Sequence, residues 1–324
     1  MFHKSFISLV ALSLICLCAC SKDNGTSEIQ KPDQPKDTTV TPPSVTTTPF
    51  SLRVGTFNIR CLSSSDTGYK NWEFRKGNCV KIVNDNSFDV IGFQEVTPSQ
   101  GDYLKSKLTD YTFHLIGRDD GESAGEAVGV AFKTSKYSIV KKGRFFLSPT
   151  PDVVSSPYPG WVSTDPGRNR VVAWTILKDK ATGRQFMYMA THLEVSKTDA
   201  VTIRLKSAEL ICSYQSKINP DGLPCILVGD MNSKPTEDSH VVFKKSFTDS
   251  YFAAEALGVR YGYKGTFNDH VYTPENYLDN QGLRIDYIYY HGSIDISKYQ
   301  VVSDKYDSYY PSDHCPVYAD LKVK

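Results

Sequence analysis

Hydrophobic and polar positions divide this chain into three stretches of different character. Residues 1–20 contain a mainly apolar run, FISLVALSLICLCA, after a single lysine. Residues 21–49 are rich in Thr, Pro, Asp, Lys and Ser and have almost no apolar side chains. From residue 50 to the end, short apolar runs alternate with polar, turn-like segments. Only this third stretch has enough apolar residues to bury a core, so the pattern predicts one globular domain over residues 50–324.

Helices are predicted at four places in this domain. The first is NWEFRKGNCVKIVNDN, in which helical spacing relates Trp72, Arg75, Cys79, Ile82 and Val83. A helix is expected after Thr97, because Thr followed by Pro is typical of an N-cap and first turn. A long helix follows the ATHLE segment, with its inner stripe expected at Val201, Leu205, Ala208, Cys212 and Gln215. The segment YFAAEALGV is interpreted as a short helix.

Strand-like runs outnumber the helices. They are short, apolar or alternating, and bounded by turn residues. They lie at residues 51–59, 88–96, 111–117, 127–133, 137–147, 169–177, 185–193, 225–232, 283–291 and 314–323. Many strands with helices at intervals indicate a layered α/β or α+β fold.

Charge gives little reason to expect non-specific binding to nucleic acid. Of 37 Lys and Arg residues, Lys4 alone precedes Cys20, which leaves 36 against 36 Asp and Glu. A balanced chain lacks the broad basic field that attracts nucleic acid non-specifically, although a local basic cleft stays compatible with it.

The first 20 residues have the pattern of a signal peptide, because the apolar run is short for a membrane span. Its end, LCAC, resembles a bacterial lipobox with Cys20 as the lipidated residue. An ordinary cleaved signal and an uncleaved anchor are the alternatives. With a lipobox, the domain is expected outside the cytoplasm, lipid-anchored to a bacterial membrane in the periplasm or at the cell surface. Residues 21–49 are then a disordered linker.

Five cysteines remain outside the signal peptide: Cys61, Cys79, Cys212, Cys225 and Cys315. Their number is odd, most lie in apolar contexts, and no pair has the spacing of a metal site. Free thiols are therefore expected rather than a disulfide framework.

Polar residues at the ends of apolar strands form the candidate site. They occur in TFNIR, GFQEV, ATHLE, VGDMNSKP, RIDYIYY and SDHCPV, and they are Asn58, Gln94, Glu95, His192, Asp230, Asn232, Asp286, Asp313 and His314. Each taken alone is more often a strand cap or a partner of nearby backbone. Six such segments with these residue types indicate instead one shared site.

These residue types suit attack of water on a phosphate ester. Glu95, Asp313 and Asn58 offer hard oxygen ligands, which suit Mg²⁺, Mn²⁺ or Ca²⁺ better than zinc. His192 and His314 can donate to phosphate oxygens. Asp230 and Asn232 are two residues apart and so face one side of a strand. The set matches metal-assisted hydrolysis of a phosphoester.

In order along the chain, GFQEV, THL, GDMN, RIDYIYY and SDHCPV resemble the motifs of the endonuclease/exonuclease/phosphatase superfamily, with its DNase I-like fold. The resemblance covers nearly all of the third stretch. It implies a four-layered αββα sandwich of two mainly antiparallel sheets with helices outside. It also implies a catalytic cleft at one edge of the sheets.

The resemblance also implies roles for individual residues. Glu95 matches the principal metal ligand, with Asn58 close by and Asp313 as a further ligand. Asp230 matches the group that orients or deprotonates water, and Asn232 the group that binds the phosphoryl oxygen. His314 matches the cleft histidine whose tautomer Asp286 fixes. His192 matches a second cleft histidine, and Glu126 its acidic partner, the alternative being a surface glutamate.

Two arginines lie in or beside the motifs that resemble the superfamily. Arg60 stands where some members of the superfamily have an acid, which casts doubt on a two-metal site of the kind that those members have. Arg170 lies in a segment that resembles secreted bacterial members and nocturnin-like deadenylases, where the matching arginine is a candidate phosphate contact; a strand-end ion pair is the alternative.

The sequence therefore predicts a metal-dependent hydrolase of phosphoester bonds that uses Mg²⁺, or Mn²⁺ or Ca²⁺. We expect a monomer that acts on a small nucleotide or phosphorylated sugar and touches the membrane only through its lipid anchor. An extracytoplasmic nuclease, with DNA or RNA as substrate, is one alternative. A non-catalytic surface binding module on the same fold is another.

Overall fold

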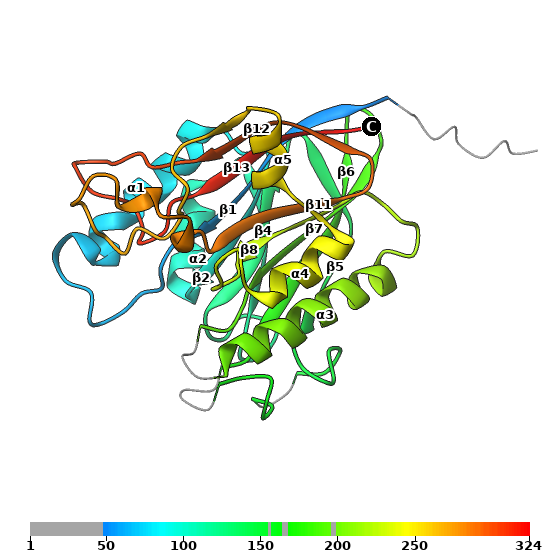
Figure 1. Ribbon diagram of the computed structural model, residues 1–324, viewed down its shortest axis with the longest axis horizontal. Coiled ribbons are helices and arrows are strands. Elements are labelled where there is room, and N and C mark those ends of the chain that lie inside the picture. The colour runs from blue at the N-terminus through cyan, green and yellow to red at the C-terminus, as the bar shows by residue number, and fades with distance from the viewer. Residues whose placement is uncertain (1–47, 155–156, 164–167, 196–198) are drawn as a thin grey trace, which may run out of the picture. The chain divides into compact units, whose positions relative to one another are not determined.

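The computed structural model describes residues 48–154, 157–163, 168–195 and 199–324. The predicted signal peptide, with Cys20, and nearly all of the predicted linker lie outside these residues. Two β-sheets lie face to face and helices cover their outer faces (Figure 1). The prediction of a four-layered sandwich is thus confirmed. None of the helices described is long and apolar enough to cross a membrane.

Seven strands form the first sheet. Their spatial order is β10 (Arg260–Tyr261), β12 (Ile294–Val301), β13 (Val317–Val323), β1 (Phe50–Asn58), β2 (Val90–Val96), β4 (Ala127–Lys133) and β3 (Tyr111–Gly117). The second sheet has the order β5 (Tyr137–Phe146), β6 (Val171–Asp179), β7 (Gln185–His192), β8 (Cys225–Asp230), β11 (Asp286–His291) and β9 (Thr248–Asp249).

Both sheets are mixed. Parallel pairing joins β1 to β2, β7 to β8 and β10 to β12, and every other neighbouring pair is antiparallel. The two longer parallel pairs, β1–β2 and β7–β8, are joined across the helices α1 (Trp72–Asn86) and α3 (Ala200–Ile218), which supply the crossover that a parallel pair needs.

The main core lies between the sheets. Val54 and Val90 of the first sheet belong to the same buried cluster as Tyr188, Ala190 and Val228 of the second. The sheets approach so closely that a Cβ at Gly92 would lie 2.4 Å from Cγ2 of Val228. The Tyr188 hydroxyl donates to the Gly55 carbonyl oxygen at 2.5 Å, so this buried polar group also has its partner across the two sheets.

Helices form the two outer layers. The helices α1 (Trp72–Asn86) and α2 (Pro98–Lys107) bury their apolar faces on the first sheet. The helices α3 (Ala200–Ile218) and α4 (Asp238–Ser246) lie beside each other on the second sheet, and the shorter α5 (Ser250–Ala256) packs against β11 and β12 (Figure 1). In the described residues, three 3₁₀ turns complete the elements, at Gly68–Lys70, Tyr277–Asp279 and Gln281–Leu283.

The helix over residues 72–86 has the buried face that the sequence predicted, residue for residue. The inner stripe predicted for α3 is confirmed at Ala208 and Gln215 and wrong at Val201, which is exposed. Leu205 and Cys212 are half-buried, and Ile203, Arg204 and Ile211 are buried although they were not predicted. The charged Arg204 lies on the buried face because Nε and Nη2 donate to the Glu237 carboxylate at 2.6 and 2.8 Å. A pattern of apolar residues cannot show a buried side chain of this kind.

The sequence pattern missed β12. Its buried residues are Ile294, Ile296, Tyr299 and Val301. The pairing with β13 shifts register between Ile296 and Lys298, so the alternation changes phase in the middle of the strand. A β-bulge of this kind disrupts the period of two by which a half-buried strand is identified.

A buried ion pair holds the beginning of β11, two residues before the predicted site residue Asp286. Arg284 donates from Nη1 to Oδ1 of Asp249 at 3.0 Å and from Nη2 to Oδ2 at 2.9 Å, and both side chains are buried. The guanidinium also lies over the rings of Tyr251 and Tyr287. Oδ1 of Asp249 accepts in addition the Tyr251 N–H and so caps α5.

We expect Asp249→Ala to lower the free energy of unfolding by about 3–5 kcal/mol, because it leaves the Arg284 charge buried and unpaired. Urea denaturation followed by circular dichroism measures this. The matched control is Asp295→Ala, which removes the exposed ion pair with Lys324 and is expected to cost less than about 1 kcal/mol. Equal effects of the two substitutions would contradict the assignment of a structural role to the buried pair.

Candidate active site

The pairing of the strands brings the predicted site residues to one edge of the sandwich. Asn58 lies opposite Gln94 in the parallel pair β1–β2, and His192 lies opposite Asp230 in the parallel pair β7–β8. Because β11 runs antiparallel to β8, its first residue, Asp286, also lies opposite Asp230. The segment before β13 reaches the same edge, since β13 runs antiparallel to β1.

Glu95 reaches the site through an irregularity of β2. The pairing of β2 with β4 shifts between Phe93 and Val96, and Glu95 has φ 61°, a left-handed conformation that is uncommon for a residue with a side chain. Its Oε1 accepts from Asn58 Nδ2 at 3.0 Å and its Oε2 from the Cys61 N–H at 2.9 Å. Strain of this kind is often found at functional sites.

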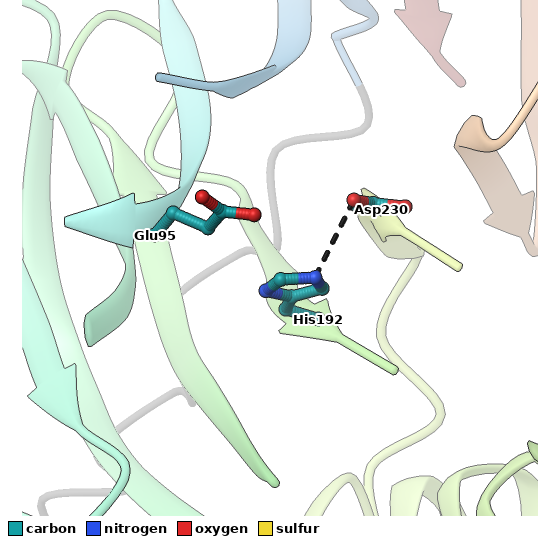
Figure 2. A group of neighbouring side chains, drawn as sticks. All are labelled: Glu95, His192 and Asp230. Carbon is teal, nitrogen blue, oxygen red and sulfur yellow. Dashed lines mark ion pairs between the residues drawn. The ribbon is translucent and has the colours of Figure 1, made fainter. Parts of the chain in front are cut away.

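Asp230 lies at the centre of the site. Its Oδ2 accepts from Asn58 Nδ2 at 3.0 Å and lies 3.4 Å from His192 Nε2 and 3.7 Å from His314 Nε2. Its Oδ1 accepts the backbone N–H of Asn232 at 2.8 Å. Figure 2 shows the imidazole of His192 between the carboxylates of Glu95 and Asp230, which point toward one another from different strands.

His314 is held by a chain of hydrogen bonds. Its Nδ1 lies 2.9 Å from Oδ2 of Asp286, which also accepts from the Thr266 hydroxyl at 2.6 Å. The hydroxyl oxygen of Thr266 accepts in turn the N–H groups of Ile285 and Asp286, each at 3.1 Å. The ring of Phe267 packs edge-on against His314. These contacts fix the ring so that Nε2 faces Asp230.

The pKa shifts follow from burial and from these contacts. Burial raises the pKa of Asp230 to about 7, against the attraction of His314. Burial and the positive charges of Arg170 and Arg118 lower the pKa of His192 well below its usual value. Burial opposes protonation of His314, but the carboxylates of Asp286 and Asp230 outweigh it and raise its pKa well above the usual value.

Glu95 remains an anion. Burial disfavours its charged form, but the attraction of His192 and the hydrogen bonds from Asn58 and the Cys61 N–H hold its pKa below the usual value. Perturbed pKa values of both signs in one cluster are typical of catalytic sites.

Asp313 is tied to Arg60. Its Oδ2 accepts from Arg60 Nη1 at 2.6 Å, and Oδ1 accepts from the Ser312 hydroxyl at 3.1 Å. The guanidinium of Arg60 also donates to both carboxylate oxygens of Asp66 at 2.7 Å. In this structure the residue predicted as a further metal ligand is therefore an ion-pair partner, and Arg60 has the structural ion pairs that the sequence left as an alternative.

Glu126 and Arg170 lie on another wall of the site. Glu126 Oε1 accepts from Arg118 Nη2 at 2.8 Å, and no hydrogen bond joins Glu126 to His192 among the residues that the structure describes. We expected Glu126 to pair with His192, but in the structure its partner is Arg118. Arg170 Nη2 lies 3.4 Å from Oε1 of Glu194.

A single cavity of about 530 Å³ collects these side chains. Of the predicted site residues within the described parts of the chain, Glu95, Glu126, Arg170, His192, Asp230, Asn232, Asp313 and His314 line it. Asn58 and Asp286 lie behind this lining and hold it through Glu95, Asp230 and His314. A cavity of this size suits a small-molecule ligand.

The donor set fits a hard divalent cation. One ligand atom from each of Glu95, His192 and Asp230 lies within 4.8 Å of the others, and the same holds for Asp230, Asp286 and His314. Each oxygen of Glu95 accepts one N–H, which leaves lone pairs directed elsewhere. Carboxylate oxygens that line a water-accessible cavity are the ligands that Mg²⁺ and Mn²⁺ prefer.

None of the five cysteines outside residues 1–47 is in a disulfide.

Sequence reasoning missed Arg118, Glu194 and Thr266. Arg118 directly follows β3 and Glu194 lies two residues after β7, so the rule that found the other residues, polar side chains at strand ends, also applies to them. Thr266 lies in an irregular segment, and nothing in the sequence around it indicates that its hydroxyl serves Asp286.

Comparisons with known proteins give one family. The profile described as "Endonuclease/Exonuclease/phosphatase family" matches residues 55–314. A crystal structure of a protein of this family from Bacteroides thetaiotaomicron is 30% identical, has a TM-score of 0.76, and the match covers 86% of this chain and 96% of that one. A mannosyl-6-phosphatase from B. thetaiotaomicron VPI-5482 is 31% identical, with a TM-score of 0.73 and coverage of 83% and 99%.

More distant similarities agree with the fold. The catalytic domain of human Nocturnin, solved with a bound sulfate anion, is 20% identical with a TM-score of 0.63, covers 84% of this chain and 93% of that one, and shows the shared fold. A curated relative, the uncharacterized protein R895 of Acanthamoeba polyphaga mimivirus, is 25% identical over 286 residues. That match covers 75% of this chain but spans only 40% of the relative's length.

Thr266→Val is expected to lower the free energy of unfolding by about 1–3 kcal/mol, because Asp286 loses a buried donor and two N–H groups lose their acceptor. Urea denaturation measures the change. Thr266→Ser keeps the hydroxyl and removes one methyl group, so it is expected to cost about 1 kcal/mol or less. If valine is tolerated as well as serine, the hydroxyl does not hold Asp286.

Proposed function

The chain belongs to the endonuclease/exonuclease/phosphatase family, and on that premise we propose that it is a divalent-metal-dependent phosphoesterase. Its substrate is a small phosphorylated molecule, a sugar phosphate or a nucleotide, and water attacks the phosphorus in line with the leaving oxygen. The observation that carries the proposal is the convergence of Glu95, His192, Asp230 and the Asp286–His314 pair in one cavity.

Glu95 is the residue that would hold the cation, with Asn58 keeping its carboxylate in place. When bound, a cation such as Mg²⁺ or Mn²⁺ supplies positive charge that neutralises the phosphate as negative charge develops on it. Asp313 lies near Glu95 but is paired with Arg60, whose charge balances its own. Its negative charge acts on Glu95 by raising the Glu95 pKa, so Asp313 contributes to the electrostatics of the site rather than as a ligand.

The side chains around Asp230 divide the work of hydrolysis. Asp230 orients the attacking water and accepts its proton, because its carboxylate is buried and faces the cavity. Asn232, His192 and protonated His314 donate to phosphoryl oxygens as the new bond between water oxygen and phosphorus forms. The bond between phosphorus and the ester oxygen then breaks, and the leaving oxygen takes a proton from solvent, while Asp230 holds the proton of the attacking water until it too returns to solvent. Asp286 keeps His314 in position throughout.

The size of the cavity and the charge of the chain support a small substrate. A long polyanion is usually bound along a line of basic residues, and this chain has 36 acidic residues against 37 basic ones. The 31% identity to a mannosyl-6-phosphatase adds support for a phosphorylated sugar.

We expect hydrolysis of p-nitrophenyl phosphate that is abolished by EDTA and restored by Mg²⁺ or Mn²⁺. Glu95→Gln and Asp230→Asn should each lower kcat by about 100-fold or more, because one removes the cation's ligand and the other the base. The matched controls are Glu73→Gln and Asp102→Asn, two exposed helix positions that should retain full activity. Hydrolysis that persists in EDTA, or in both site variants, would contradict the proposal.

We further propose that Cys20 carries the lipid anchor and places the enzyme outside the cytoplasm. The leader with its LCAC ending motivates this. In bacteria fed a clickable palmitate analogue, the full chain should be labelled and recovered with membranes, whereas Cys20→Ala should be unlabelled. Cys18→Ala is the control and should still be labelled. Label in Cys20→Ala, or none in the wild type, rules the anchor out.

A further inference from the structure

One wall of the catalytic cavity carries arginines that the proposed reaction does not use. Arg118 and Arg170 line it, and the exposed Arg168 lies at its rim. Arg118 follows β3 at the end of the first sheet, whereas Arg170 precedes β6 in the second. The two side chains therefore lie where β3 and β6 pack together. We call Arg118, Arg168 and Arg170 the arginine wall, and both sheets contribute to it.

The two guanidinium groups have more donors than partners. The Arg118 and Arg170 side chains are 13% and 5% exposed. A guanidinium carries five N–H groups. In the described parts of the chain, the side chain of Arg118 bonds only to Glu126, and that of Arg170 only to Glu194 at a long 3.4 Å. The Nε of each is buried without a hydrogen-bond partner. The protein therefore supplies acceptors for only part of these N–H groups, although both side chains line the cavity.

The charges on this wall also favour a ligand that is an anion. Arg118, Arg168 and Arg170 lie together in the lining of the cavity, with Glu126 and Glu194 as the acids that pair with Arg118 and Arg170. Burial, together with repulsion from Arg170 and Arg168, lowers the pKa of Arg118 despite its pairing with Glu126. An anion in the cavity relieves this repulsion, because it adds negative charge where like charges are crowded.

The position of the wall relative to the catalytic groups decides what the anion is. A narrow space beside the main cavity is lined by Arg118, Arg170, His192 and Glu95 together. The arginines thus flank the catalytic group formed by Glu95, His192 and Asp230, rather than a remote part of the surface. The arginines and the catalytic group therefore border the same space.

We infer that Arg118 and Arg170 form an oxyanion subsite for a terminal phosphate, so that the enzyme selects phosphate monoesters over diesters. The inference rests on the proposed function and names its substrate class. A monoester has three non-bridging oxygens and close to two negative charges, whereas a diester has two such oxygens and one charge. The third oxygen can accept from the arginine fork, which matches oxyanions in a planar, two-pronged geometry.

In a diester, that third oxygen carries the second alcohol instead. The alcohol has no charge to offer the arginines and has to occupy the space in front of them. The reaction on a monoester is balanced by water alone: the water oxygen binds to phosphorus, the ester P–O bond breaks, and the products are the alcohol and inorganic phosphate.

The experiment compares p-nitrophenyl phosphate with bis(p-nitrophenyl) phosphate in the presence of Mg²⁺. The wild type should prefer the monoester. Arg118→Gln and Arg170→Gln should each lower kcat/KM for the monoester by about 10- to 100-fold, the effect of one lost charge-assisted hydrogen bond, and change that for the diester by less than about 3-fold. Arg260→Gln is the matched control, because Arg260 has one acidic partner, Glu255 at 3.4 Å, outside the cavity.

A binding measurement gives a second readout that does not depend on turnover. Calorimetric titration of the Mg²⁺-loaded protein with inorganic phosphate should show affinity reduced by a similar factor in Arg118→Gln and Arg170→Gln, and unchanged in Arg260→Gln. Arg118→Lys keeps the charge without the fork and should fall between the wild type and Arg118→Gln. Thermal unfolding of each variant shows that loss of binding is not loss of fold.

The outcomes separate the two proposals. Equal losses on both substrates, or a wild type that prefers the diester, would overturn the subsite while leaving the phosphoesterase intact. Absence of hydrolysis with either substrate counts against the proposed function, and the phosphate titration then tests the subsite alone. Unchanged phosphate affinity in both arginine variants would overturn the subsite in either case.

Discussion

The hydrogen bonds of a single amide group join the two sheets at the edge where the site lies. Asn58 Nδ2 donates to Glu95 in the first sheet and to Asp230 in the second, each at 3.0 Å. Both bonds have the usual length of an N–H···O hydrogen bond, and both acceptors are carboxylates. The rest of the site is arranged around these two acids, because His192 and His314 both lie against Asp230.

Placing several carboxylates in a buried cleft is costly, and the structure offsets this cost locally. Asp313 is paired with Arg60, Asp286 with His314, and Asp249 with Arg284. Asp230 has no arginine or lysine partner among the described residues, and burial raises its pKa to about 7. His314, Asn58 and the Asn232 N–H stabilise the Asp230 anion, but burial outweighs them. An acid with a raised pKa beside groups with pKa values shifted the other way is the arrangement expected of a catalytic site.

The sequence predicted the positions of the site residues more accurately than it predicted the details of the fold. Parallel pairing of β1 with β2 and of β7 with β8 carries strand ends to one edge, and residues such as His192 and Asp230 are recognisable as strand ends without a structure. The prediction failed where tertiary contacts or an irregular strand override the local pattern. Arg204 lies on the buried face of α3 because it pairs with Glu237, 33 residues away, and a bulge hid β12. Glu126 pairs with Arg118, only eight residues away, rather than with His192. Periodicity of apolar residues contains neither ion pairs nor bulges.

His192 is close to groups of opposite charge. It lies beside the carboxylates of Glu95 and Asp230, and burial together with the positive charges of Arg170 and Arg118 lowers its pKa. A histidine kept neutral in this way can donate a hydrogen bond without adding to the positive charge of the arginine wall. In the mechanism that we propose, the arginines act on the ligand directly and also through His192, although neither is on a strand that carries a proposed catalytic acid. In that mechanism, strand ends of β2, β7 and β8 supply the reaction groups, and the segments beside β3 and β6 supply selection. A change of arginines in those segments can therefore alter the substrate while the hydrogen bonds of Asn58 and the reaction centre stay in place.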